Sequence, residues 1–442
     1  MPTAIDLLIE PGWIIPIEPV GVVLEDHALV VDKGRILALL PTSEATSRYL
    51  PTEHVRLPGQ VLLPGFVNLH THAAMALFRG YADDLPLMRW LNERIWPAER
   101  QFASPEFVRD GTLLAAWEML RGGVTCFNDM YYYPGAAAES ARQAGIRAVL
   151  GVTVIEFPTA YAADAGDYLA KGLAVRDVWR DEPLVSFALA PHAPYTVSDR
   201  TFERVATLAA QLDLAIHIHL HETIEEIESS VKVHGVRPIE RLHRIGMLGP
   251  NLVAVHAVHI NQHEINQLAT NGCFIAHCPT SNMKLASGLA PIGGLLAAGV
   301  RIGLGTDGAA SNNRLDILQE ARLAALLAKM ASGDASTVSA HQALRMATLD
   351  GAAALGMEQA IGSLLPGKWA DLCSIRLDDW ITQPCYCPAS HIVYVAGREQ
   401  VSHVWVAGEL KICNSQPVGI APTELIEISN SWHNPQRLRN VD

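Results

Sequence analysis

Eight short apolar runs, each separated from the next by a plausible helix, constrain the fold of this chain more than any other feature. Strands that alternate with helices form parallel sheets, and eight such strands suit a closed barrel better than an open sheet. The sequence therefore predicts an α/β fold whose main part is a (β/α)8 TIM-like barrel over residues 64–365. The eight runs span residues 61–69, 124–127, 148–154, 184–189, 215–220, 252–258, 273–276 and 300–304.

The two ends of the chain show a different pattern from its middle. Residues 28–31 and 35–40 are short apolar pieces between Gly, Pro and Asp, which is typical of small antiparallel β structure. The same pattern returns after the predicted barrel, for example at residues 370–375. We therefore predict that residues 1–63 and 366–442, the latter including a C-terminal tail, supply one small β-sandwich domain built from both chain ends.

The formal net charge of -13 gives the protein no electrostatic means of holding a polyanion such as duplex nucleic acid. A small neutral or cationic ligand fits this charge better. The chain has no apolar stretch of membrane-spanning length and no N-terminal secretory pattern, and its seven cysteines lack paired metal-binding spacings. We expect a cytoplasmic homo-oligomer with reduced thiols, a small-molecule ligand, and neither nucleic acid nor membrane as a partner.

Histidines gather where two of the predicted strands end. His70 and His72 are two residues apart, so both imidazoles can face one ion, although a structural or surface role explains such a pair equally well. His217, His219 and His221 alternate along another run and are expected to share one face of the strand. A solvated polar face is an alternative for His217 or His221 but not for all three.

Two further strand ends carry groups that suit catalysis. His256 lies within the run at residues 252–258, and Asp307 lies between glycines after the run at 300–304, where an Asx turn is the alternative. Glu222 lies just past the strand end at Leu220 and can reach into a barrel mouth. All these residues fall at the carboxyl ends of strands, which is the rim where barrel enzymes build their active sites.

Several motifs that contain these residues resemble signatures of the amidohydrolase superfamily, specifically the methylthioadenosine/S-adenosylhomocysteine deaminase group. The resemblance extends from the first strand of the predicted small β domain to the segment IGSLLPGK and covers nearly the whole chain. The motifs are PGFVNLHTH at residues 64–72, HLHE at 219–222, HCPTSNMKLASG at 277–288, LGTDGAASN at 304–312 and IGSLLPGK at 361–368.

The resemblance implies a metal site formed by His70, His72, His219 and Asp307. Zinc is the first expectation, and iron, manganese or nickel suit imidazole and carboxylate ligands nearly as well. Relatives with two ions bridge them through a modified lysine on the fourth strand. Residues 185–192 contain no lysine, so we expect one divalent ion.

The resemblance also implies a hydrolytic deaminase mechanism. A bound divalent ion lowers the pKa of water toward ~7 and so provides hydroxide at neutral pH. Asp307 is expected to accept the water proton, and His256 to hydrogen-bond the nucleophile and the developing oxyanion. Glu222 is expected to protonate the ring nitrogen next to the attacked carbon, so that ammonia leaves and an inosine analogue remains.

Two residues match substrate contacts of the group. Glu99 resembles the carboxylate that takes both ribose hydroxyls, and His192 resembles the residue that reaches the purine ring; a solvated helix charge and a turn residue are the respective alternatives. Trp90 and Trp96 can either border an apolar pocket or belong to the core.

The substrate is expected to be an adenine nucleoside. The only arginine near the third strand, Arg147, precedes it, so 5'-methylthioadenosine, which carries no charged tail, is favoured over S-adenosylhomocysteine; adenosine is a further candidate. An arginine from a neighbouring subunit would change that preference. Two alternatives stay open: hydrolysis of another amino-heterocycle, such as guanine, a pterin, an s-triazine or cytosine, and a noncatalytic scaffold.

Overall fold

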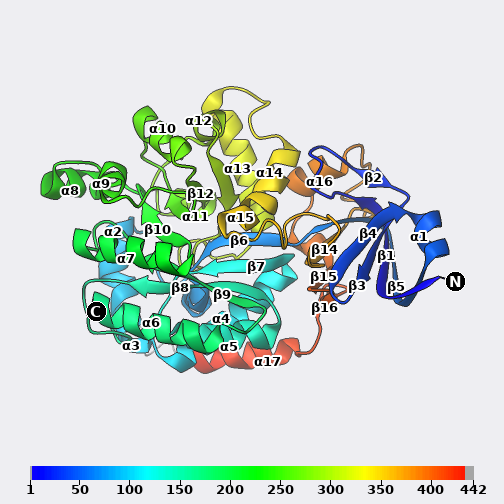
Figure 1. Cartoon of the computed structure of the whole chain (residues 1–442), viewed down its shortest axis with the longest axis horizontal. Coiled ribbons are helices and arrows are strands. Elements are labelled where there is room, and N and C mark those ends of the chain that lie inside the picture. The colour runs from blue at the N-terminus through cyan, green and yellow to red at the C-terminus, as the bar shows by residue number, and fades with distance from the viewer. Residues whose placement is uncertain (1, 434–442) are drawn as a thin grey trace.

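The computed structural model describes residues 2–433 and contains a barrel of eight parallel strands, which confirms the predicted fold class (Figure 1). Neighbouring strands pair in chain order from the first to the eighth. Most of their residues are buried, as expected for a parallel sheet covered by helices. The strands are β6 (Phe66–Thr71), β7 (Val124–Asp129), β8 (Arg147–Val154), β9 (Val185–Pro191), β10 (Ile216–Leu220), β11 (Leu252–His256), β12 (Phe274–His277) and β13 (Arg301–Leu304).

Irregular hydrogen bonds, not a regular ladder, connect the last strand of the barrel to the first. The backbone N–H of Asp307 donates to the carbonyl of His70 at 2.9 Å, and that of Thr306 donates to Asn68 Oδ1 at 3.0 Å. Because these bonds join residues just past β13 to β6, they bring Asp307 directly beside the histidines at the end of β6. The barrel closure therefore contributes to the site.

The helices that cover the barrel begin at residues suited to capping. Side chains at six of these N-termini accept a hydrogen bond from the first turn, namely Ser104, Asp164, Ser198, Thr223, Asn261 and Asp316. The helices from the third to the thirteenth are α3 (Trp96–Phe102), α4 (Pro105–Arg121), α5 (Pro134–Ala144), α6 (Ala165–Trp179), α7 (Asp199–Leu212), α8 (Ile224–His234), α9 (Pro238–Ile245), α10 (Gln262–Thr270), α11 (Pro279–Lys284), α12 (Ile292–Ala297) and α13 (Ile317–Ser332).

Shorter elements complete the barrel region. A segment that precedes α3 extends over the carboxyl-terminal rim through η1 (Ala73–Phe78), α2 (Leu87–Trp90) and η2 (Leu91–Ile95). After α13, the chain forms α14 (Ala340–Met346) and α15 (Leu349–Ala354), and α15 packs against β6 and β13. No helix among residues 2–433 is long and apolar enough to cross a membrane.

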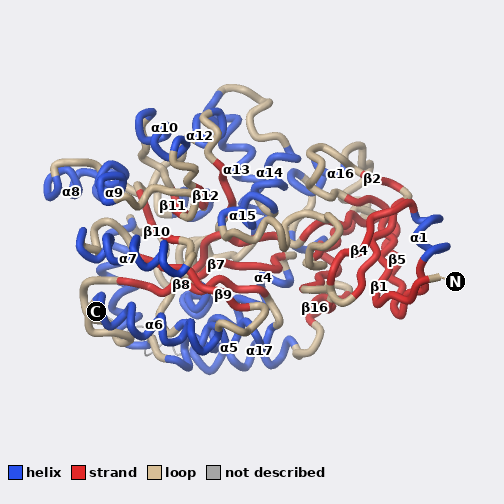
Figure 2. The backbone as a smooth tube through the Cα atoms, in the orientation of Figure 1, coloured by secondary structure: helices blue, strands red, loops and turns tan. Residues whose placement is uncertain are grey.

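Both chain ends form one mixed sheet beside the barrel, as predicted (Figure 2). The hydrogen-bonded order is β17-β16-β15-β14-β5-β1-β3-β4, with β2 paired to β1. The N-terminal strands are β1 (Thr3–Ile14), β2 (Leu24–Glu25), β3 (His27–Asp32), β4 (Arg35–Pro41) and β5 (Tyr49–Pro64), with helix α1 (Thr42–Arg48) between the last two. The C-terminal strands are β14 (Leu372–Arg376), β15 (Val401–Val406), β16 (Glu409–Cys413) and β17 (Gln416–Pro417).

Two details of this region differ from the sequence prediction. β1 pairs with β5 in parallel, whereas the N-terminal part was expected to be antiparallel, because α1 serves as a short crossover that lets β5 return in the same direction. The predicted run at residues 61–69 is divided at Gly65 between the end of β5 and β6. A Cβ on Gly65 would lie 2.2 Å from the Thr125 side chain, so glycine permits this close passage.

The C-terminal segment also contacts the barrel. Helix α16 (Pro388–Tyr394) and the short turn η3 (Arg398–Gln400) lie between β14 and β15, and α17 (Pro422–Trp432) runs along α4 (Figure 1). Trp432 donates from Nε1 to Asp110 Oδ2 at 2.9 Å. At the junction of the two regions, Arg147 forms a buried ion pair of 3.1 Å with Asp371. The domain boundaries predicted at residues 63/64 and 365/366 stay a prediction.

Candidate functional site

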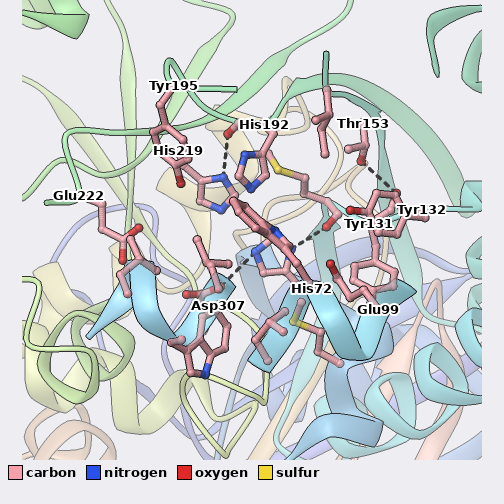
Figure 3. Close-up of a pocket in the computed structure, with 18 of the residues that line it drawn as sticks. His72, Glu99, Tyr131, Tyr132, Thr153, His192, Tyr195, His219, Glu222 and Asp307 are labelled. Carbon is pink, nitrogen blue, oxygen red and sulfur yellow. Dashed lines mark hydrogen bonds and ion pairs between the residues drawn. The ribbon is translucent and has the colours of Figure 1, made fainter. Parts of the chain in front are cut away.

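The predicted site residues converge on one cavity at the carboxyl-terminal rim of the barrel (Figure 3). His70 is fully buried, and its Nε2 atom lies 3.2 Å from Asp307 Oδ1. The other seven predicted residues border the cavity: His72, Glu99, His192, His219, Glu222, His256 and Asp307. Five strands and one helix, far apart in the sequence, thus bring these side chains together.

Four of these residues form a compact set of potential metal ligands. Asp307 Oδ1 lies 3.2 Å from His70 Nε2 and 3.3 Å from His72 Nε2. One donor atom each from His70, His72 and His219 lie within 4.8 Å of one another, as do donors from His70, His256 and Asp307. Three imidazoles and one carboxylate suit zinc and also iron, manganese or nickel.

Outer hydrogen bonds fix the protonation of two of the imidazoles. His72 Nδ1 lies 2.6 Å from the carbonyl oxygen of Met130, and His219 Nδ1 lies 2.8 Å from that of His192. Because a carbonyl oxygen can only accept, each Nδ1 must carry a hydrogen, so Nε2 is the nitrogen that presents a lone pair in the neutral imidazole. This is the tautomer that a metal ligand requires.

The surroundings of His70 and Asp307 fit a bound cation. His70 Nε2 is buried and has no hydrogen-bond partner among the described residues, and its Nδ1 lies 2.9 Å from His217 Nε2. Asp307 Oδ2 accepts from Ser281 Oγ at 2.7 Å and from Ser311 Oγ at 2.9 Å. Burial opposes ionisation of Asp307, but the neighbouring imidazoles hold its pKa well below the usual carboxyl value. The carboxylate is therefore ionised and oriented.

The backbone is strained where the site residues leave their strands. His221, His256 and Asp307 have φ angles of 57°, 74° and 62°, in the left-handed region that non-glycine residues rarely adopt. Such conformations cost roughly 1–3 kcal/mol each and are concentrated at functional sites. At His256 and Asp307 they accompany side chains that face the cavity.

Glu222 borders the cavity beside His256. Its Oε1 accepts from Ser287 Oγ at 3.1 Å, and its Oε2 lies 3.6 Å from His256 Nε2. Burial raises the pKa of Glu222, while the nearby His256 opposes that rise. The other ring nitrogen of His256, Nδ1, lies 2.8 Å from Asn282 Oδ1. The carboxyl group is thus positioned and biased toward its protonated form.

His217 and His221 are buried, so neither belongs to a solvated polar face. His217 lies on the same strand face as His219 and contacts His70. His221 does not share that face, contrary to the expected alternation, because it follows the end of β10 and its positive φ turns the chain. Its Nε2 accepts from the backbone N–H of Ile239 at 3.1 Å. His221 therefore stabilises the loops around the rim.

Both predicted substrate contacts, Glu99 and His192, border the cavity. Glu99, on α3, is only 7% exposed, which excludes the solvated helix charge considered above. Burial raises its pKa to about 7, and the hydroxyls of Tyr131 and Tyr132 partly oppose this rise. His192 borders the cavity with its Nδ1 3.0 Å from Thr196 Oγ1.

Several supporting residues were not identified from the sequence. Ser281, Asn282 and Ser287 lie in the motif at residues 277–288, and Ser311 lies in the motif at 304–312, but spacing alone gave them no role. Thr153 and three tyrosines also line the cavity, and both Trp90 and Trp96 border it, while Trp90 also packs in the core. The remaining apolar lining comprises Met75, Leu87, Leu91, Ile95, Met130, Ile155, Phe157 and Leu285.

Several known proteins resemble this chain in sequence or in structure over most of its length. A protein of Teredinibacter turnerae named 5-methylthioadenosine/S-adenosylhomocysteine deaminase is 46% identical over 430 residues, covering 97% of each chain. A 5'-deoxyadenosine deaminase of Methanopyrus kandleri is 39% identical, covering 93% of this chain and 92% of its own. The structure of an adenosine deaminase from Xanthomonas campestris with bound zinc superposes with a TM-score of 0.97 at 48% identity, covering 99% of this chain and 100% of that one. The model of the amidohydrolase family matches residues 61–411, and the chain belongs to this family.

Proposed function

We propose that this protein is a metal-dependent hydrolytic deaminase of adenine nucleosides. The observation that carries the proposal is the convergence of the His70, His72 and His219 imidazoles and the Asp307 carboxylate at a cavity that also contains Glu222 and the buried Glu99. The three similar proteins described above are named as deaminases of adenine nucleosides, which supports the same reaction. The products are ammonia and the corresponding inosine analogue.

His70, His72, His219 and Asp307 would hold one divalent ion, and zinc is our first choice. When bound, such an ion lowers the pKa of water to about 7 and so supplies a nucleophile at neutral pH. The modified lysine that bridges two ions in binuclear relatives has no counterpart on β9, whose sequence VSFALAP contains no lysine. This supports a single ion.

The protein's own groups then move the protons. The Asp307 carboxylate accepts a proton from the attacking water, and two serine hydroxyls at Oδ2 keep it oriented. His256 Nε2, beside Glu222, hydrogen-bonds the attacking water and the oxygen that forms on the ring carbon. Glu222 donates its proton to the adjacent ring nitrogen, and its raised pKa favours the protonated state from which it must start.

We propose 5'-methylthioadenosine as the preferred substrate. Glu99 would accept hydrogen bonds from both ribose hydroxyls, and His192 would contact the purine. Within the described chain, neither lysine nor arginine borders the cavity. Arg147 lies at the start of β8, at the opposite end of the strand from the rim, and forms an ion pair with Asp371. An apolar wall suits a thiomethyl group better than a charged amino-acid tail. Arg100, which borders an adjoining cavity together with Glu99, keeps S-adenosylhomocysteine as a candidate to test.

Ammonia release from purified protein loaded with zinc tests the proposal. We expect kcat/KM to be highest for 5'-methylthioadenosine, lower for S-adenosylhomocysteine and adenosine, and negligible for guanine and cytosine, which offer no ribose to Glu99. Turnover of a free base but of no nucleoside would reject the assignment. Failure of every amino-heterocycle, with no metal bound, would instead favour a noncatalytic scaffold.

Glu222→Gln should leave the metal content unchanged and lower kcat by about a hundredfold or more, because an amide cannot deliver the ring proton. The exposed Glu228 on α8 provides a control, since Glu228→Gln changes the same charge outside the cavity. Near-native turnover of the Glu222 variant would remove this residue from the mechanism.

The remaining parts of the proposal concern the cellular location, the oligomeric state and the partners of the enzyme. We propose that it acts in the cytoplasm as a homo-oligomer on a small nucleoside, with neither nucleic acid nor membrane as a partner. The net charge of -13 supports the exclusion of polyanions. Sedimentation measurements give the number of subunits.

A further inference from the structure

We propose that Glu226 is a positioning residue that holds the proton-donating Glu222 in place, an inference that rests on the proposed function. Glu226 is 6% exposed and lies in the first turn of α8. Its Oε1 accepts from the backbone N–H of His221 and its Oε2 from that of Glu222, both at 2.9 Å. Both carboxylate oxygens are thus directed at the segment that carries the catalytic acid.

The chain needs an acceptor at this point because of how β10 ends. The strand stops at Leu220, and His221 adopts the left-handed conformation. Helix α8 starts only at Ile224, so the N–H groups of residues 221 and 222 belong to neither element. A buried N–H without an acceptor is destabilising, and one bidentate carboxylate satisfies both of these N–H groups.

These bonds fix Glu222 at both ends. Glu226 holds its backbone, while Ser287 Oγ, at 3.1 Å, holds its side-chain oxygen. Proton transfer depends on this placement, since a misplacement of about 1 Å can lower a rate about a hundredfold. A neutral amide at position 226 could accept only one of the two N–H groups and would direct its own N–H₂ at the other. The segment would then shift with Glu222 on it.

The chemistry of Glu226 itself supports a dedicated role. Burial raises the pKa of Glu226, and the two backbone N–H donors oppose that rise because they favour the ionised carboxylate that accepts from both. The preceding residue, Glu225, is exposed on the same helical turn, and its side chain forms no hydrogen bond or ion pair within the described part of the chain. The pair offers a buried and an exposed glutamate on one turn for direct comparison.

Glu226→Gln and the control Glu225→Gln, both as zinc-loaded protein, test the inference. In the Glu226 variant we expect faster hydrogen–deuterium exchange of the amides at residues 221 and 222, kcat for 5'-methylthioadenosine lowered about 10- to 100-fold, and KM and zinc content within about twofold of wild type. The control should match wild type in every measurement. Unchanged amide exchange, or loss of zinc or of the cooperative melting transition, would overturn the positioning role.

A double mutant separates action through Glu222 from a general effect on the fold. If Glu226 acts only by placing Glu222, adding Glu226→Gln to Glu222→Gln should lower the residual turnover by less than about twofold. A further loss equal to that of the single mutant would overturn the proposal. Should wild type deaminate no nucleoside, the proposed function fails, and the exchange measurement still decides whether Glu226 holds the segment.

Discussion

Replacing Glu99 with glutamine should make the protein more stable above neutral pH and less active at the same time. Glu99 is 7% exposed, and burial raises its pKa from 4.5 to about 7 while two tyrosine hydroxyls partly oppose the rise. The folded protein therefore binds this proton more tightly than the unfolded chain does. Between about pH 4.5 and 7 the folded state loses stability as the pH rises, and above that range the loss is complete.

The size of this effect follows from the pKa values. A rise from 4.5 to about 7 corresponds to roughly 3 kcal/mol of lost stability, at about 1.4 kcal/mol for each pKa unit. A chain of 442 residues unfolds with an entropy of roughly 0.9 kcal/mol per kelvin, from about 2.1 cal/mol/K per residue. Glutamine is neutral at every pH, so the variant should melt about 3 °C above wild type at about pH 8.5. The difference should disappear near pH 4, where wild-type Glu99 is protonated in both states.

Thermal melting of metal-free wild type and variant across this pH range checks the reasoning, because metal occupancy then does not vary. Glu93→Gln is a matched control, since Glu93 is exposed and paired with Arg89 at 2.8 Å and its replacement should not stabilise the protein at any pH. If the melting temperatures of variant and wild type differed equally at low and at high pH, burial of the Glu99 charge would be refuted as the cause of the difference. A variant less stable than wild type at high pH would refute it as well.

The same substitution should lower kcat/KM for 5'-methylthioadenosine about 10- to 100-fold, because hydrogen bonds to a charged group contribute about 1.5–3 kcal/mol. Glu99 would then be a residue retained for substrate binding at the expense of stability. A variant that gains stability and keeps full activity would remove Glu99 from the ribose site.

Two further substitutions test the support of the proposed metal ligands. Ser281→Ala removes the shorter of the two hydroxyl bonds to Asp307 and should weaken zinc binding about tenfold, measured by chelator competition; unchanged affinity would assign that hydroxyl no role. Gly305→Ala would place a Cβ 2.8 Å from His70 Cβ and 2.9 Å from its backbone nitrogen, so we expect a loss of about 1–3 kcal/mol in stability together with reduced zinc content. If this variant kept wild-type stability and zinc content, the backbone around His70 would be able to move enough to accommodate the added Cβ.

The fold and the position of the histidines at strand ends could be predicted because their signals are local. Alternating strands and helices, and histidines two apart on a strand, are periodic patterns visible within a few residues. His221 failed the same rule because a single positive φ ends the alternation. The parallel pairing of β1 with β5 depends on how a short helix redirects the chain. The hydroxyl and amide groups of Ser281 and Asn282 reach Asp307 and His256 across 26 residues, and no period links those positions.

The outer hydrogen bonds show why part of the site leaves no trace in the sequence. His72 and His219 are held by backbone carbonyls, which any residue at positions 130 and 192 would supply, so the identity of those residues carries no information about the tautomer. His70 is held by a side chain, His217, whose replacement would remove the partner. A histidine such as His217, two residues before a proposed ligand on the same strand, can therefore be noticed in the sequence. A backbone carbonyl partner can be identified only in the folded chain. Substitution at residue 130 should accordingly affect the cavity wall but not the protonation of His72.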